Sequence, residues 1–162
     1  MMNYQNKGLS VMEMSHRSKN FIEIAVQCEK NLREILEIPE NFEVFFLQGG
    51  ASFMFAGACF NLLGDKKKAN YLTTGLWSKN ATNEAKKFCE VVEVASTYDV
   101  KNNANIADPS TWKIDPEGAY LHYCDNETVH GFEFNEFPFH VLPEGMLLVG
   151  DMCSNLCTKK IQ

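Results

Sequence analysis

Apolar residues near the start of the chain recur at the spacing of one helical face. Ser15 or Ser18 can cap a helix here, which we expect to run to about Leu36, with Pro39 beyond its end. The apolar face of this helix comprises Phe21, Ala25, Cys28, Leu32 and Ile35. The segments 52–63 and 78–88 are also expected to be helical, and Gly64 suits a left-handed cap after the first of them.

Short apolar runs alternate with these helices and predict strands. The runs are Phe42–Leu47, Tyr71–Thr74, Val91–Ala95, Ala119–Tyr123 and Met146–Val149. The aromatic segment Phe132–His140 is expected to form a short edge strand, because Pro138 argues against a central place. The segment Tyr98–Ser110 is polar and without periodicity, which predicts a loop.

Alternation of strands and helices predicts an α/β fold, a mostly parallel sheet with helices on both faces. We expect residues 1–162 to form a single domain, without a linker. In such sheets, ligands bind beyond the carboxyl ends of the strands. This rule selects Gln48–Ser52, Thr74–Trp77, Cys124–Gly131 and Asp151 as the places to look for chemistry.

The residues at these strand ends include several that can bind a ligand. Gly49 and Gly50 permit close approach of backbone N–H groups to an anion at a helix N-terminus, and Ser52 adds a hydroxyl. Trp77 can stack on a flat ring, and Asp151 can pair with a cation or a protonated ring nitrogen. Each also has a purely structural interpretation: a tight turn, a core tryptophan, and a turn or N-cap carboxylate.

Arginine is scarce in this chain, which draws attention to the segment before the first helix. Only Arg17 and Arg33 occur, and Arg33 falls on a polar helix face. The Arg17 guanidinium can hold a carboxylate or a phosphate, or it can form a surface ion pair. The adjacent His16 more often caps or packs than catalyses.

Composition excludes several classes of function. The chain of 162 residues has a net charge of −6 and no long basic tract, which argues against a nucleic-acid partner. No apolar stretch has the roughly 20 residues that a membrane span requires. The six cysteines form no Cys-x-x-Cys pair, which favours reduced thiols in a cytoplasmic protein over a disulfide framework or a metal site.

An anion-binding turn, an aromatic plate and a carboxylate at one edge suit a planar, phosphate-bearing cofactor with a basic ring nitrogen, and pyridoxal 5′-phosphate is such a group. Five segments also resemble the phosphoserine aminotransferase family, a homodimeric class-V family of fold-type I pyridoxal-phosphate enzymes. They are SVMEMSHRS (Ser10–Ser18), FLQGGASFMF (Phe46–Phe55), TTGLWSK (Thr73–Lys79), DPSTWKIDPEGAYLHYCDNETVHG (Asp108–Gly131) and GDMCSNL (Gly150–Leu156).

The resemblance implies an activity and a role for each matched residue. The family transfers an amino group between L-glutamate and 3-phosphohydroxypyruvate and so makes O-phospho-L-serine for serine biosynthesis. By this resemblance, Ala51 and Ser52 hold the cofactor phosphate, Trp77 stacks on the pyridine ring, Thr128 bonds near the ring hydroxyl, Asp151 pairs with the pyridine nitrogen, and His16 and Arg17 bind substrate.

The resemblance also implies that the chain matches only part of the family's large domain, truncated at both ends and without the small C-terminal domain. The Schiff-base lysine of the family has no counterpart among the 13 lysines here, so we expect the chain alone to be inactive. Two alternatives are a non-catalytic fragment that keeps a dimerisation surface, and an unrelated nucleotide-binding α/β domain.

Overall fold

The computed structural model describes residues 2–98 and 105–161 of the chain. The chain divides into two compact units, Met1–Phe46 and Leu47–Lys160. The expectation of a single domain stays a prediction, and residues 99–104 of the expected polar loop lie outside the described residues.

The first unit contains one long helix, α1 (Lys19–Ile35), preceded by the 3-10 turns η1 (Tyr4–Asn6) and η2 (Val11–Glu13). The Ser18 side chain accepts a hydrogen bond from the Phe21 backbone N–H at 3.3 Å, which confirms the expected cap. None of the residues of α1 is buried, although its apolar positions follow the helical spacing.

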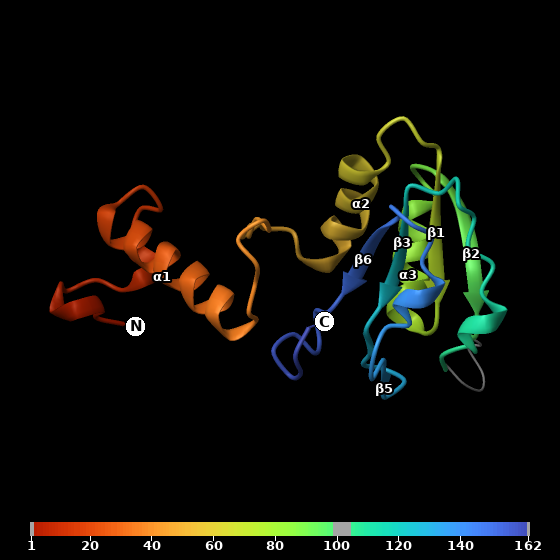
Figure 1. Cartoon of the computed structure of the whole chain (residues 1–162). Helices are drawn as coiled ribbons and strands as arrows, with labels where there is room; N and C mark the ends of the chain where they lie inside the picture. The colour runs from red at the N-terminus through yellow and green to blue at the C-terminus, as the bar shows by residue number, and fades with distance from the viewer. Residues whose placement is uncertain (1, 99–104, 162) are drawn as a thin grey trace. The chain divides into compact units, whose positions relative to one another are not determined.

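The second unit is built on a four-stranded sheet with the order β2-β1-β3-β6 (Figure 1). The strands are β1 (Lys68–Thr73), β2 (Glu90–Ser96), β3 (Tyr120–Cys124) and β6 (Leu147–Asp151). All three pairings are parallel, which confirms the expected sheet. Parallel direction places the carboxyl ends of β1, β3 and β6 at the same edge.

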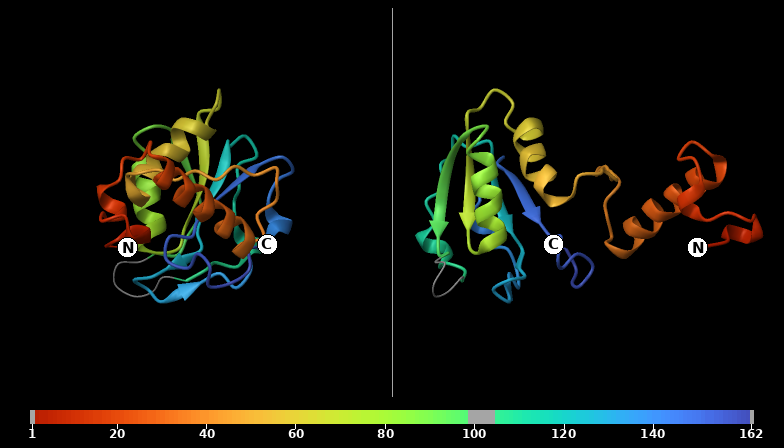
Figure 2. Two further views of the ribbon diagram at one scale, coloured as in Figure 1. Left: turned by 90° about the vertical axis from the view of Figure 1, so that its left-hand side faces the viewer. Right: turned by 180° about the vertical axis from the view of Figure 1, so that it is seen from behind.

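Helices α2 (Gly50–Leu62) and α3 (Leu76–Ala85) pack against one face of this sheet (Figure 2). Phe55 and Cys59 of α2 and Ala81 of α3 form a core cluster with Tyr71 and Tyr120. The Tyr71 and Tyr120 hydroxyls are 2.7 Å apart, so this core contains a satisfied polar pair.

Loops and single 3-10 turns cover the opposite face. Here Leu72, Leu121 and Tyr123 pack with Phe134 and Phe137. The 3-10 turns that belong to this covering are η3 (Pro109–Thr111) and η4 (Phe139–Val141). The fold is therefore α/β with helical segments flanking a parallel sheet, and the longer helices lie on one face.

The expectation of a buried strand at Phe42–Leu47 is wrong. This segment has no regular secondary structure, and Phe45 and Leu47 are 74% and 67% exposed. Its apolar residues satisfy the strand pattern, but a strand needs a hydrogen-bonded neighbour. None of the strands in 2–98 and 105–161 pairs with it.

The expected edge strand at Phe132–His140 is correct only for its first two residues. Strand β5 (Phe132–Glu133) pairs with β4 (Asn126–Glu127) in a separate antiparallel sheet. Pro138, which has no N–H to donate, then caps η4 in place of a continued strand.

Leu121 is fully buried in the central strand β3, so its side chain should contribute strongly to stability. Leu121→Ala should lower the free energy of unfolding by about 2–5 kcal/mol, because it removes a side chain from the core and leaves a cavity. Urea denaturation measures the change. The matched control is Leu147→Ala on β6, where the side chain is 51% exposed, and its cost should be below about 1 kcal/mol. Equal losses in both variants would contradict a core centred on β3.

Candidate functional site

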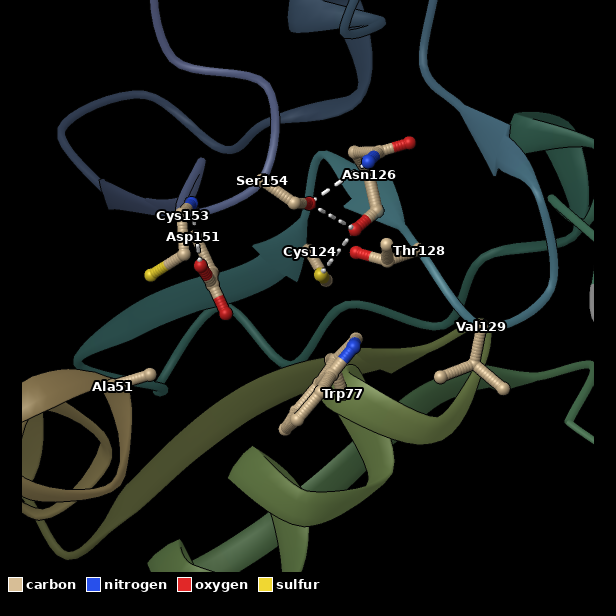
Figure 3. Close-up of a pocket in the computed structure, with 9 residues that line it drawn as sticks. All are labelled: Ala51, Trp77, Cys124, Asn126, Thr128, Val129, Asp151, Cys153 and Ser154. Atoms are coloured by element: carbon tan, nitrogen blue, oxygen red, sulfur yellow. Dashed lines mark hydrogen bonds between the residues drawn. The ribbon is translucent and has the colours of Figure 1, made fainter.

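A cavity of about 300 Å³ opens at the carboxyl ends of the parallel strands (Figure 3). This volume is at the lower end of the range for small-molecule sites, roughly 300–1,000 Å³. The lining residues come from α2, from α3, from the segment between the end of β3 and the residues just after β4, and from the last residue of β6 with the segment that follows it. They are Ala51, Trp77, Cys124, Asn126, Thr128, Val129, Asp151, Cys153 and Ser154.

Trp77 forms one wall of the cavity from the first turn of α3. Helix α3 begins two residues earlier than expected, with Gly75 as its N-cap, so Trp77 belongs to the helix. The side chain is 38% exposed, which rules out a core tryptophan. Its indole is therefore available as a flat surface for a ring.

Asp151 ends β6 beside the backbone of β3. Its Oδ1 accepts a hydrogen bond from the Cys153 backbone N–H at 3.0 Å, and its carbonyl accepts one from the Asp125 N–H at 2.9 Å. Asp151 therefore does stabilise the turn after β6, which is the structural role that the sequence also allowed. The carboxylate also lines the cavity opposite the indole (Figure 3). The hydrogen bond between the Cys153 thiol and this carboxylate, followed by burial and by the negative charge of Asp151, raises the pKa of the thiol to about 11.

His122 is in the middle of β3, the strand that pairs with β6, which ends at Asp151. Its ring stacks on Tyr71 with the centroids 5.0 Å apart, and its Nδ1 is buried without a hydrogen-bond partner. His122 and Asp151 line a second, smaller cavity of about 200 Å³. Burial lowers the pKa of His122 to about 4, against a partial opposing effect of the Asp151 charge, so the ring is neutral at pH 7.

The N-terminus of α2 faces the same cavity through Ala51. Gly49, with φ of 116°, turns the chain into this helix, and a Cβ at Gly49 would lie 2.6 Å from the Phe53 Cβ. The first turn of α2 has no acidic residue and no side-chain cap. Its free N–H groups and positive helix end therefore suit an anion.

Hydrogen bonds between Asn126 and Ser154 connect β4 to the segment after β6 at the cavity. The Asn126 Nδ2 donates to the Ser154 Oγ at 2.8 Å, and the Ser154 Oγ donates to the Asn126 carbonyl at 3.2 Å. Ser154 and Cys153 are not among the site residues expected from the sequence. Their place two and three residues after Asp151, at a strand end, is the signal that could have found them.

The whole chain, residues 1–162, matches the family described as aminotransferase class-V. The chain belongs to this family. A phosphoserine aminotransferase of Chromobacterium violaceum is 44% identical over 161 residues, which are 99% of this chain and 44% of that protein. One from Acinetobacter baylyi is 40% identical over 96% of this chain and 42% of its own length. This class-V aminotransferase chain thus spans less than half the length of these curated relatives.

The solved structures agree with this family and with the fold. A phosphoserine aminotransferase from Trichomonas vaginalis, described as bound to PLP, superposes with a TM-score of 0.90 at 40% identity. The superposition covers 100% of this chain and 44% of that one. The parallel α/β architecture of this class-V aminotransferase chain is therefore that of a fold already solved in its relatives.

Four of the seven site residues selected from the sequence line the cavity of this class-V aminotransferase chain: Ala51, Trp77, Thr128 and Asp151. Ser52 lines an adjoining cavity of about 270 Å³, to which Trp77 also contributes. His16 and Arg17 belong to the first unit, and their substrate-binding role stays a prediction. Within 2–98 and 105–161, no three His, Cys, Asp or Glu side chains could hold a metal ion.

Lys159, one of the two adjacent lysines near the end of the sequence, makes its contacts away from the cavity. Its Nζ forms an ion pair with the Asp125 carboxylate at 2.7 Å and donates to the Phe134 carbonyl. Asn155 donates to the same carboxylate at 2.6 Å. These contacts anchor the segment after β6 to the β3–β4 connection. Lys159 is not among the residues that line the cavity.

The lowered pKa of His122 predicts a pH dependence of stability. The unfolded chain binds a proton at His122 near the ordinary pKa of 6.5, whereas the folded chain does so only near 4. The free energy of unfolding should therefore decrease as the pH falls from 6.5 to 4, by up to about 3 kcal/mol from this group. Urea denaturation across this range measures the decrease.

The matched pair of variants for this measurement is His122→Phe and His140→Phe, since His140 is exposed. His122→Phe should remove this component of the pH dependence, and His140→Phe should retain it. A His122→Phe variant with the slope of the unmodified chain would show that His122 is not the group responsible.

Proposed function

We propose that the cavity binds pyridoxal 5′-phosphate. The observation that carries this proposal is that Ala51, Trp77, Thr128 and Asp151, from four separate segments, line one cavity. The aromatic side chain suits a planar ring, the carboxylate suits a basic ring nitrogen, and the helix N-terminus suits a phosphate. The hydroxyl adds a hydrogen-bonding group. The solved relative from Trichomonas vaginalis is described as bound to this compound, which supports the proposal.

Each residue would make one kind of contact with this cofactor. The Asp151 carboxylate would pair with a protonated pyridine nitrogen, and its hydrogen bond from Cys153 fixes its orientation. The Trp77 indole would stack on the ring. When bound, the cofactor supplies an electron sink that weakens the bond between the substrate α-carbon and its proton.

The remaining contacts are to the phosphate and the ring hydroxyl. The N–H groups of Ala51 and Ser52 lie in the first turn of α2, where they have no acceptor within the helix. They would hold the phosphate, together with the Ser52 hydroxyl, at the positive end of the helix. The Thr128 hydroxyl would form a hydrogen bond with the cofactor in the region of its ring hydroxyl.

We further propose that the chain is part of an aminotransferase that converts 3-phosphohydroxypyruvate and L-glutamate to O-phospho-L-serine in serine biosynthesis. The names of the curated relatives support this reaction. His16 and Arg17 would bind the carboxylate or phosphate of the substrate. Within the described residues no helix has the length and apolarity of a membrane span. We propose a cytoplasmic location, where free cysteines such as the six of this chain are typical.

Self-association is the second proposed property, in keeping with a homodimer. Helix α2 presents Phe53 and Phe60 at 57% and 71% exposure, and Phe60 contacts the ring of Phe88 with centroids 4.8 Å apart. Exposed apolar clusters of this kind mark protein–protein interfaces. The alternative of a non-catalytic chain that keeps a dimerisation surface uses the same residues.

The binding proposal is tested with pyridoxamine 5′-phosphate, which has no aldehyde to react with surface lysines. The full chain labelled with 5-fluorotryptophan has two ¹⁹F signals, because only Trp77 and Trp112 are present. We expect the Trp77 signal to shift on titration. Trp112, whose indole N–H donates to the Ala107 carbonyl, should not respond.

Asp151→Asn should weaken this binding about tenfold, because it removes the charge that pairs with the ring nitrogen. Asp65→Asn, in an exposed turn, is the matched control and should leave the affinity unchanged. Absence of any Trp77 response in the unmodified chain would contradict the proposal. A Trp77 response to adenosine monophosphate instead would favour the nucleotide-binding alternative.

A further inference from the structure

Glu127 is a fully buried carboxylate that does not line the cavity. Its side chain is 0% exposed, whereas glutamate is almost never fully buried unless its charge is compensated. It lies on β4, one residue before Thr128. A buried group of this kind requires partners, and the partners of Glu127 come from a distant part of the sequence.

Those partners are in the turn between β1 and α3. The Trp77 backbone N–H donates to Glu127 Oε2 and the Ser78 backbone N–H donates to Oε1, both at 2.9 Å. The Thr74 hydroxyl donates to Oε1 at 3.5 Å. The two N–H groups belong to the first turn of α3 and have no acceptor within the helix. Glu127 therefore caps α3 from another strand, and its negative charge faces the positive helix end.

Gly75 makes room for this carboxylate. A Cβ at Gly75 would lie 2.4 Å from Glu127 Cδ, so any other residue would displace the side chain. The Gly75 backbone is extended, with φ of −164°, so glycine is needed here for space and not for its conformational freedom. The N–H groups of Thr74 and Gly75 instead donate to the Ser78 Oγ, at 2.8 and 2.9 Å.

The contacts of Glu127 connect two segments that line the cavity. Trp77, on α3, donates its backbone N–H to Glu127, and Thr128 follows Glu127 directly in the chain. Figure 3 shows the two side chains on different sides of the cavity. Both bonds join a carboxylate oxygen to a backbone N–H group, and the Ser78 bond is buried while the Trp77 bond is partly buried. The connection between the two segments is therefore direct.

We propose that Glu127 is a positioning residue that holds the Trp77 indole and the Thr128 hydroxyl at the separation required by a planar ring. The inference rests on the proposed cofactor site and adds to it a residue that does not touch the ligand. Loss of the carboxylate should displace Trp77 even without a ligand, because its backbone N–H then lacks an acceptor.

Glu127→Gln is the direct test. The amide keeps the volume of the side chain but has a single acceptor oxygen, so it can accept from the Trp77 N–H or from the Ser78 N–H but not from both, and its NH₂ group then faces the other donor. In the full chain labelled with 5-fluorotryptophan, we expect the Trp77 signal to move without ligand while the Trp112 signal stays in place. The affinity for pyridoxamine 5′-phosphate should fall about tenfold. Glu136→Gln, an exposed acid beyond β5, is the matched control and should change neither readout.

Gly75→Ala is the second variant and covers the case in which Glu127→Gln does not fold. It keeps the carboxylate and its charge but pushes the side chain away from α3, and it should produce the same two effects. Thermal unfolding followed by circular dichroism establishes which variants are folded. A folded Glu127→Gln or Gly75→Ala chain with an unmoved Trp77 signal would overturn the inference, and so would one that binds as tightly as an unmodified chain that binds.

The two proposals fail in different ways. If the unmodified chain does not bind pyridoxamine 5′-phosphate, the proposed cofactor site is wrong. The ligand-free Trp77 signal still decides whether Glu127 positions the indole. If the unmodified chain binds and Glu127→Gln binds equally well, the site stands and the positioning role does not.

Discussion

The parallel pairing of β3 with β1 on one side and β6 on the other is the constraint on which the cavity depends. In this register Cys124 lies opposite Asp151, the last residue of β6. Because the three strands run in the same direction, the turns that follow them emerge at one edge and place Trp77, Thr128 and Asp151 around one volume. A slip of one residue between β3 and β6 would turn the side chain of Asp151 to the other face of the sheet.

Buried polar groups make this arrangement specific. Asn70, in the middle of β1, accepts from the Asp115 N–H at 2.9 Å and donates to the Asp115 carbonyl at 3.0 Å, which fixes the turn before β3. Asp125 and Glu127 receive donors from the segment after β6 and from α3 respectively. Each of these side chains is costly to bury alone and is satisfied by backbone or side-chain groups of another element. Hydrogen bonds between distant elements thus help to hold the loops at the cavity in place.

Local patterns were enough to predict much of the fold. The Ser18 cap, the strand at Val91–Ala95 and the left-handed Gly64 after α2 all follow from residues close in sequence, and the structure contains each of them. The segment Phe42–Leu47 has the same apolar character as the true strands, yet it forms none. A strand is defined by its neighbour, and composition cannot say whether a neighbour is present. Similarly, Ser154 and Cys153 line the cavity only because the turn after Asp151 folds back on Asn126.

The sequence by itself determined the class of fold, the edge of the sheet that carries chemistry, and the residue types gathered there. These properties follow from the period of apolar residues and from strand direction, which are local or nearly so. Only the tertiary structure decided that the carboxylate of Glu127 caps α3 across a gap of about fifty residues, or that His122 is buried neutral behind Asp151. Burial and hydrogen bonding depend on which distant segments meet, and this is a property of packing that no short segment encodes.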